Sequence, residues 1–173
     1  MFMKKEKIFI QFSNIKYYLI FKGDLMHEYL KQTYYNRKAN LSSNKLDSFT
    51  NLENEVLKIV NEERKKVDLP PLFNNKQLNL AARQRAKEQS IKFAHRRPSG
   101  DDCFTIIKQY NIKCSGMGEN LAMGQTSPSQ VMECWMNSEG HRKNILYEKF
   151  REMGVGLYID INKRYYWAQI FIY

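Results

Sequence analysis

Residues 118–146 read GENLAMGQTSPSQVMECWMNSEGHRKNIL and carry the clearest local signals in the chain. Ser127 followed by Pro128 predicts the start of a helix, because a serine oxygen accepts a hydrogen bond from the first turn and proline suits the first helical position. Gly140 is expected to end this helix, since glycine readily leaves the helical conformation. His141 follows at once, so the stretch predicts a histidine at a helix end beside a glycine.

Two more helices are predicted upstream of this stretch. Thr50 with Glu53 matches a capping box, and the apolar residues that follow recur at helical spacing until two prolines at 70–71 end the helix. Asn74 begins a second helix, which is expected to run to about Lys92. The part of the chain before residue 118 is therefore predicted to be mainly helical.

The tail of the chain has a different pattern. Residues 154–173, GVGLYIDINKRYYWAQIFIY, are rich in β-branched and aromatic residues. They predict two strands, about 154–160 and 165–172, joined by a turn at 162–163, while a short helical turn is expected near 104–109. Because helices precede a terminal antiparallel hairpin, the predicted fold class is α+β rather than an alternating βαβ arrangement.

Length and composition indicate one folded domain of ordinary size. The chain has 173 residues, 43% of them hydrophobic and 27% charged, which is typical of a soluble globular protein with a proper core. The net charge of +10 admits nucleic acid, an anionic membrane or an acidic cell wall as partners. No run of Lys and Arg is dense, and no predicted helix carries a basic stripe, so we expect a solvated surface and no nucleic-acid binding.

The three cysteines do not define a redox compartment. Cys103, Cys114 and Cys134 form no CxxC pair and no zinc-finger spacing, and their odd number excludes a fully paired framework within one chain. One bridge between the first two, which are nearest in sequence, and three unpaired thiols are both open. Cys134 is also expected to face inward from its helix.

The first part of the chain is expected to be separate from the domain. Residues 1–48 form a basic, aromatic-rich leader or a degraded signal segment that ends in a linker at 40–48, and the domain covers 49–173. KKEK at 4–7 resembles the start of a signal peptide. The apolar stretch at 8–15 is interrupted by polar residues and lacks a cleavage site, so we predict no convincing signal peptide and no transmembrane helix.

Few residues of the domain suggest chemistry. His95 and His141 each lie near a predicted helix end, but neither belongs to an HExxH pair. Glu119 lies among glycines in GMGENLA, where it would cap an amide, orient a partner or simply face solvent. Each histidine is either a structural residue or a ligand on this reasoning. Trp135 and Trp167 are expected to be core residues rather than stacking platforms for a ligand.

Five segments, in this order, resemble the bacterial branch of the CAP superfamily, also called the SCP domain family. They are FAHRRPSGDDCF, GENLA, WMNSEGHRKNIL, EMGVGLY and YYWAQIF. The resemblance covers roughly residues 50–173, and the superfamily includes cysteine-rich secretory proteins and plant pathogenesis-related proteins. It implies an α-β-α sandwich with a small, mainly antiparallel sheet.

The resemblance also implies a site. In many members two histidines and two glutamates line a cleft and hold a divalent metal, often zinc, so His95 and His141 become candidate metal ligands and Glu119 a candidate proton acceptor. The position of the second glutamate is occupied by Ser138, and Glu139 beside it is a candidate substitute although one residue rotates a helical side chain by about 100°. Two imidazoles supply half of a tetrahedral zinc shell, so binding of zinc or another divalent cation is expected to be weak and exchangeable.

Three functions follow as hypotheses. The leading one is a binding or effector module that acts outside the cell or at the envelope on a protein, lipid or cell-wall ligand, because no complete catalytic constellation is visible. The alternative is a metal-dependent hydrolase of peptides or cell-wall polymers that uses the same histidines and Glu119. The third is a structural domain whose basic leader binds anionic surfaces.

Overall fold

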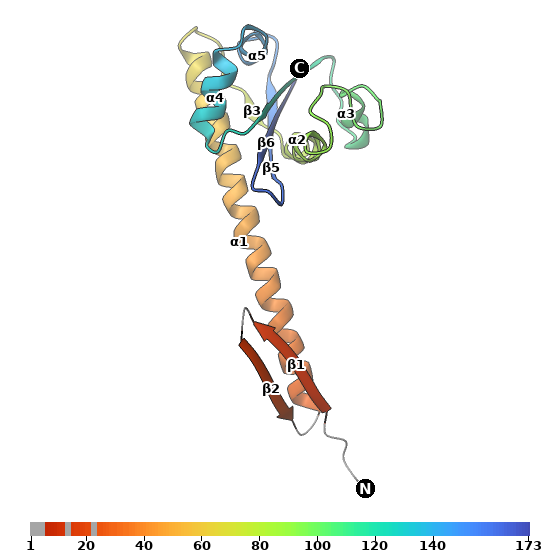
Figure 1. Cartoon of the computed structure of the whole chain (residues 1–173). Helices are drawn as coiled ribbons and strands as arrows, with labels where there is room; N and C mark the ends of the chain where they lie inside the picture. Colours follow the sequence, from red (N-terminus) through yellow and green to blue (C-terminus); the bar gives the residue numbers. More distant parts are fainter. Residues whose placement is uncertain (1–5, 13–14, 22–23) are drawn as a thin grey trace. The chain divides into compact units, whose positions relative to one another are not determined.

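The computed structural model describes the backbone of the chain except residues 1–5, 13–14 and 22–23, and its side chains over residues 31–38 and 49–173. The chain divides into two compact units, Met1–Asp47 and Ser48–Tyr173 (Figure 1). Among the residues so described, no helix combines the length and the hydropathy that a membrane span requires.

The first unit contains regular structure that the sequence analysis did not predict. Strands β1 (Glu6–Phe12) and β2 (Ile15–Phe21) pair antiparallel, which suits their β-branched and aromatic residues. Helix α1 (Asp24–Lys65) then runs through residues 40–48, so this segment is helical and not irregular as the linker pattern predicted. That segment contains neither proline nor glycine, and its Asn and Ser residues only weaken a helix. The start of the leader lies outside the described residues, so a signal segment and a surface-binding role both stay predictions.

The second unit is built around a four-stranded sheet of order β3-β5-β6-β4. Its strands are β3 (Phe73–Asn74), β4 (Met117–Met123), β5 (Glu152–Ile159) and β6 (Tyr165–Ile172). β5 and β6 form the predicted antiparallel hairpin, β4 pairs antiparallel with the other edge of β6, and β3 is parallel to β5. The sheet is therefore small and mainly antiparallel, as expected.

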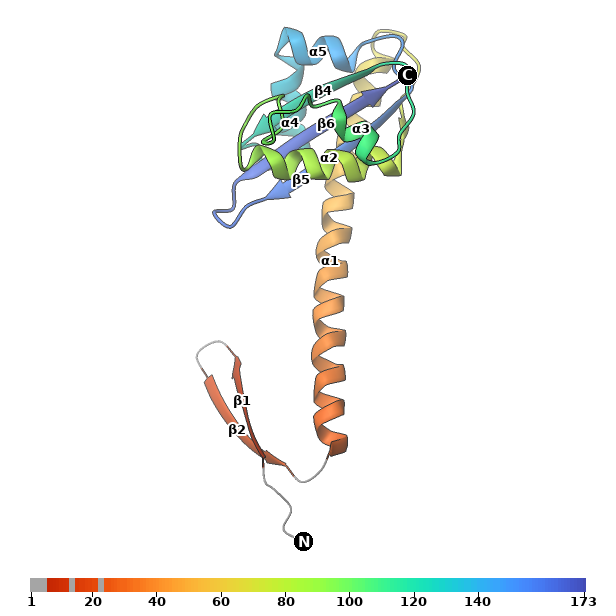
Figure 2. The same cartoon turned by 90° about the vertical axis from the view of Figure 1, so that its right-hand side faces the viewer.

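Helices cover both faces of this sheet (Figure 2). On one face lie α2 (Lys76–Gln89) and α3 (Thr105–Gln109), whose buried residues form a core with Leu121 and Ile170. On the other lie the end of α1, α4 (Pro128–Met136) and α5 (Glu139–Ile145), which form a core with Trp135 and Trp167. The α+β class and the α-β-α sandwich are confirmed, and both tryptophans are fully buried in the core.

Two glycines of β5 allow α2 to lie directly on the sheet. A Cβ atom at Gly156 would collide with the backbone of Ala82, and one at Gly154 would collide with the backbone of Leu78. The GVG sequence thus permits a close helix–strand contact that any larger residue would block. Because α2 lies this close to β5, its side chains can reach across β6 to strand β4.

The predicted capping box is wrong. Thr50 and Glu53 lie inside α1, because the helix begins 26 residues before Thr50 rather than at it. Glu53 is buried, forms an ion pair with Arg83 of α2 and accepts a hydrogen bond from the backbone N–H of Leu157 at 3.1 Å. The carboxylate of Glu53 therefore links α1 to α2 and β5 and does not cap the start of a helix.

Gly140 does not end a helix. α4 already ends at Met136, and α5 begins at Glu139 after Ser138, whose backbone is extended with φ −100° and ψ 121°. His141 therefore lies in the first turn of α5 instead of in a loop behind α4. The second predicted helix is also shorter than expected, since α2 ends at Gln89.

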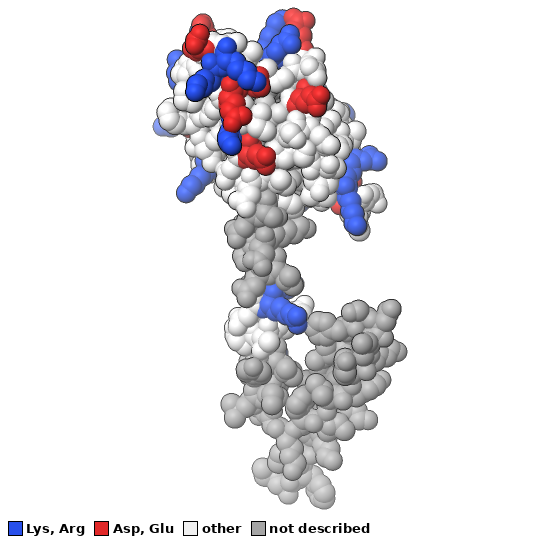
Figure 3. All heavy atoms as spheres, turned by 90° about the vertical axis from the view of Figure 1, so that its left-hand side faces the viewer, with Lys and Arg blue, Asp and Glu red and all other residues white. Residues whose placement is uncertain are grey.

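All three cysteines are unpaired thiols. Cys103 is buried, whereas Cys114 and Cys134 are exposed. The expected inward orientation of Cys134 is wrong, because Met132 takes that place in the core next to Val131. On the face shown in Figure 3, acidic and basic side chains of the second unit are interspersed, as on a solvated surface.

Candidate functional site

Glu119 is a buried carboxylate in the middle of strand β4. Side chains alternate along a strand, so Glu119 shares a face with Leu121 and points toward the layer formed by α2. Only 1% of its side chain is exposed. The expectation of a turn glutamate in solvent is wrong, and the alternative expectation of a residue that orients a partner fits the structure.

The partner that fixes Glu119 is Arg85 of α2, which the sequence analysis missed. Arg85 is fully buried, and its Nε donates to Oε2 of Glu119 at 2.7 Å while its Nη2 donates to Oε1 at 3.1 Å. Burial lowers the pKa of Arg85, but the hydrogen bonds and charges of Glu119 and Glu88 together outweigh burial and raise the pKa. A signal existed, because Arg85 interrupts the apolar face of α2 formed by Leu78, Ala81 and Ala82.

His95 is held on this ion pair. Its Nδ1 donates to Oε1 of Glu119 at 2.9 Å, and Nη2 of Arg85 donates to the backbone carbonyl of His95 at 3.0 Å. The hydrogen bond to Glu119 raises the pKa of His95 despite burial. The imidazole is nevertheless 63% exposed, so it presents its other edge to solvent.

A second carboxylate extends the network beneath the loop that carries His95. Glu88 of α2 accepts a hydrogen bond from Nη1 of Arg85 at 2.6 Å and another from Nη2 of Arg97 at 2.6 Å. Burial raises the pKa of Glu88, yet the hydrogen bonds from Arg97 and Arg85 bring this pKa below its usual range. The network thus contains two positive and two negative side chains whose charges balance without His95: Arg85, Arg97, Glu88 and Glu119.

His141 approaches the same place from α5. Burial lowers the pKa of His141, and the charge of His95 lowers it further. Its Nδ1 is buried and has no hydrogen-bond partner within the described part of the chain. Its backbone carbonyl accepts from Nδ2 of Asn120 at 3.1 Å, which ties the first turn of α5 to β4.

Glu139 does not join this group. Its side chain is 74% exposed and pairs with Lys143 at 2.7 Å along the same helix. Ser138, which stands at the position of the expected second glutamate, makes no capping hydrogen bond with its side chain. The structure therefore joins His95 to Glu119, ties the backbone of His141 to the neighbouring Asn120, and leaves Glu139 at the surface.

The residues present do not fit a complete cation site. No group of three or more His, Cys, Asp or Glu side chains over the described residues is arranged to hold a metal ion. Both oxygens of Glu119 already accept hydrogen bonds from Arg85, and a buried guanidinium repels a nearby cation. What remains is two imidazoles, which is fewer than the three protein ligands usual in catalytic zinc sites.

The same hydrogen bonds limit proton transfer by Glu119. A general base needs an oxygen within reach of the proton that it removes. Oε1 accepts from His95 and Arg85, Oε2 accepts from Arg85, and the carboxylate is shielded from solvent. Glu119 thus orients His95 and balances Arg85, while the exposed edge of His95 is what an incoming molecule meets.

Comparison with known sequences points to one family. The sequence model of the cysteine-rich secretory protein family, CAP, matches residues 57–171. YkwD of Bacillus subtilis (strain 168) is 37% identical over 137 residues, covering 78% of this chain and 52% of that protein. The chain therefore spans about half the length of this curated relative.

Solved structures share the fold of the second unit. An extracellular protein with an SCP domain from Bacillus anthracis matches with a TM-score of 0.66 and 28% identity, over 72% of this chain and 41% of that one. An outer surface protein from Borrelia burgdorferi matches with a TM-score of 0.61 and 20% identity, over 67% and 87%. Both neighbours are extracellular or surface proteins by their descriptions.

Proposed function

Since this chain belongs to the cysteine-rich secretory protein family, CAP, we propose that it is a non-catalytic binding module that acts outside the cell or at the cell envelope. The observation that carries the proposal is that both carboxylate oxygens of Glu119 already accept hydrogen bonds from other residues of the chain. Its carboxylate is buried against Arg85 and His95, so the site offers a fixed imidazole surface while Glu119 itself is not free to act as an acid or base.

The surface around His95 suits contact with another molecule. Ile91 and Phe93 precede His95 in the loop after α2, and both are exposed although they are large and apolar. The network beneath them is rigid because Arg85 also donates to the backbone carbonyl of Ala94 at 3.1 Å. A preorganised loop with exposed apolar residues loses little conformational entropy when it binds.

A hydrolase remains the alternative candidate for this site. It is supported by the orphaned Nδ1 of His141 and by the backbone bond of His141 to Asn120, next to the Glu119 that holds His95. The two imidazoles would hold a divalent cation weakly. The cation would supply a polarised water for hydrolysis. The bonds between Arg85 and Glu119 weigh against this role, because they occupy the group that would accept the proton.

Isolated Bacillus subtilis envelopes, containing wall, membrane and attached proteins, test the proposal. The purified full chain is mixed with them, and the bound fraction and any release of soluble fragments are measured in the same sample. We expect retention without release, weakened by Phe93→Ala and unchanged by Lys76→Ala, an exposed control on α2.

Two outcomes would overturn the proposal. One is steady release of fragments that stops with a chelator and with Glu119→Gln, which would establish the hydrolase. The other is the absence of any retention by the unmodified chain, which would remove the envelope as its place of action.

A further inference from the structure

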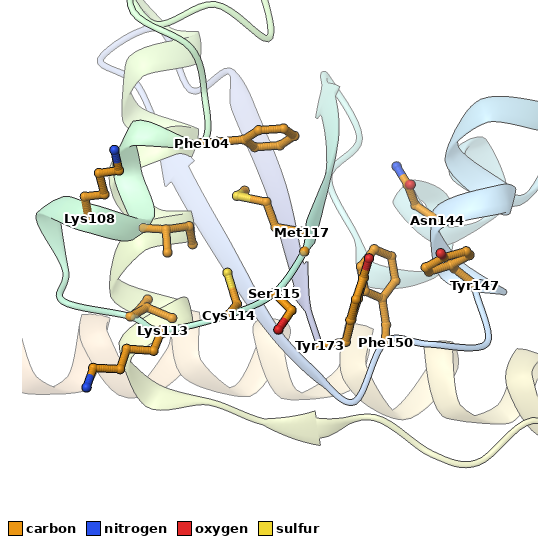
Figure 4. A pocket seen from close by; sticks show the side chains of 13 residues that line it. Phe104, Lys108, Lys113, Cys114, Ser115, Met117, Asn144, Tyr147, Phe150 and Tyr173 are labelled. Atoms are coloured by element: carbon orange, nitrogen blue, oxygen red, sulfur yellow. The ribbon is translucent and has the colours of Figure 1, made fainter.

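A hollow of about 810 Å³ lies at the start of β4. One wall of the hollow is formed by α3 (Figure 4). The opposite wall is formed by the segment after α5 and by Tyr173, the residue that follows β6. Neither His95 nor His141 lines it, whereas Asn144 does. The site described above therefore does not account for this surface.

The walls of the hollow are aromatic and partly uncovered. Tyr147 and Tyr173 lie with ring centroids 6.1 Å apart, and both are exposed, as is Phe104 across the hollow. Figure 4 shows the side chain of Met117 between these two walls. Large apolar groups that line one open concavity indicate a surface on which an apolar side chain can be buried.

The main chain of β4 is open at the same place. Gly116 and Tyr173 exchange two hydrogen bonds, at 3.3 and 3.2 Å, so the antiparallel register turns the N–H and C=O of Met117 away from β6. Within the described residues, β6 is the only strand that pairs with β4. Beyond Met117 this edge is closed, because Asn144 donates to the carbonyl of Glu119 at 3.2 Å and Trp135 donates to that of Leu121 at 3.1 Å.

The charge of the hollow has one sign. Lys108 and Lys113 stand on its rim beside α3, and no Asp or Glu is among the residues that line it (Figure 4). An occupant that carries carboxylates near these lysines gains attraction at a partly desolvated surface. The combination of an open strand edge, aromatic walls and a basic rim is the combination that recognises an extended acidic peptide.

We propose that this hollow binds an extended acidic segment of a partner protein. The segment pairs with the backbone of Met117 as a short added strand, lays an apolar side chain against Tyr147 and Tyr173, and places carboxylates near Lys108 and Lys113. The proposal rests on the function proposed above, that of a binding module, and adds a second surface and the chemistry of the partner.

The test uses the full chain labelled with ¹⁵N and two acetylated, amidated hexapeptides, one alternating Asp with Phe and the other Asp with Val. We expect saturable shifts of the Met117 amide with a Kd on the order of 0.1–1 mM. The double variant Lys108→Glu/Lys113→Glu should weaken binding roughly tenfold. Its matched control is Lys76→Glu/Lys87→Glu, which changes the net charge equally on exposed residues of α2.

Met117→Pro isolates the backbone contact. Proline removes an N–H that β6 does not use and is tolerated at the edge of a sheet, so the fold should persist while peptide binding weakens. Unchanged amide shifts for β5 and β6 show that the variant is folded. Equal peptide affinity of this variant and of the unmodified chain would overturn the added-strand pairing.

Other results would overturn the proposal as a whole. These are no shift at Met117 with either peptide at millimolar concentration, equal weakening by the control lysines, or tighter binding of a hyaluronate hexasaccharide in the same hollow. The last outcome would assign the hollow to anionic glycans. Peptide binding that persists in a chain that envelopes do not retain would refute only the envelope proposal, so the two failures are distinguishable.

Discussion

Arg85 and Glu119 form an ion pair that is closed to solvent on both sides, with two hydrogen bonds of 2.7 and 3.1 Å between the guanidinium and the carboxylate. The pair bridges α2 and β4, and His95 is bonded to both members through its ring or its backbone. The position of the exposed imidazole is therefore a consequence of a buried contact between two layers of the sandwich.

Arg85→Met should destabilise the domain strongly. The substitution leaves Glu119 as a buried carboxylate without its counter-ion, and such losses cost about 3–5 kcal/mol. Urea unfolding followed by circular dichroism measures the change in the free energy of unfolding. Arg85→Met/Glu119→Gln is the matched control, and it should lose less than the sum of the two single variants because it removes both charges. Additive losses would show that the pair is not coupled.

Glu119→Gln should lower the pKa of His95. The hydrogen bond to the carboxylate is the main cause that raises this pKa, and a neutral amide supports the imidazolium less well. NMR titration of the ring protons gives the value directly in both proteins. An unchanged pKa of His95 would mean that the histidine does not contact Glu119 in solution.

The stability that His95 contributes should depend on pH. Its folded-state pKa is raised above the ordinary value of about 6.5, so its contribution is fully present below that value and is lost as pH rises through the folded-state pKa. The gap in unfolding free energy between the unmodified chain and His95→Gln should thus be larger near pH 5.5 than near pH 8.5. His141 has the opposite sign because its pKa is lowered, mainly by burial, and burial is the same in both proteins. The smaller part that the charge of His95 causes is missing from His95→Gln, which narrows the gap at low pH without reversing it.

Gly156→Ala should destabilise the domain and disturb the site from a distance. The added Cβ meets the backbone of Ala82, which cannot yield as the end of a flexible side chain can, so a loss of about 1–3 kcal/mol or more is expected. The amide signal of Arg85 should shift in the NMR spectrum because α2 moves from the sheet. Gly140→Ala, where nothing lies within 4 Å of the new Cβ, is the control and should leave that signal in place.

Helices and strands were predicted well where a few neighbouring residues determine how the element starts or pairs. Ser127 accepts the N–H of Gln130 and starts α4 as expected, and the strand pattern of the tail gives the β5–β6 hairpin. The same reasoning failed at Thr50 and Gly140. A capping pattern cannot reveal that the chain before it is already helical, and a glycine cannot reveal that α4 has ended before it and a second helix has begun.

The site was predicted only in part for a different reason. The five segments in order pointed to His95, Glu119 and His141; the structure joins the first two by a hydrogen bond and ties the backbone of His141 to Asn120. Arg85 lies 34 residues before Glu119, and only the contact between α2 and the sheet brings its guanidinium to that carboxylate. Arg85 binds both oxygens of the Glu119 carboxylate, and the positions of the two residues in the sequence do not predict this contact.

Zinc titration of the full chain by calorimetry at pH 7 distinguishes a Glu119 that Arg85 holds to orient His95 from a Glu119 that binds a metal. Complete structural zinc shells bind with about 10–16 kcal/mol. We predict no zinc binding tighter than about 10 μM, and weak binding, where detected, that is lost with His141→Ala. Submicromolar binding that disappears with Glu119→Gln as well as with His95→Ala and His141→Ala would contradict the account.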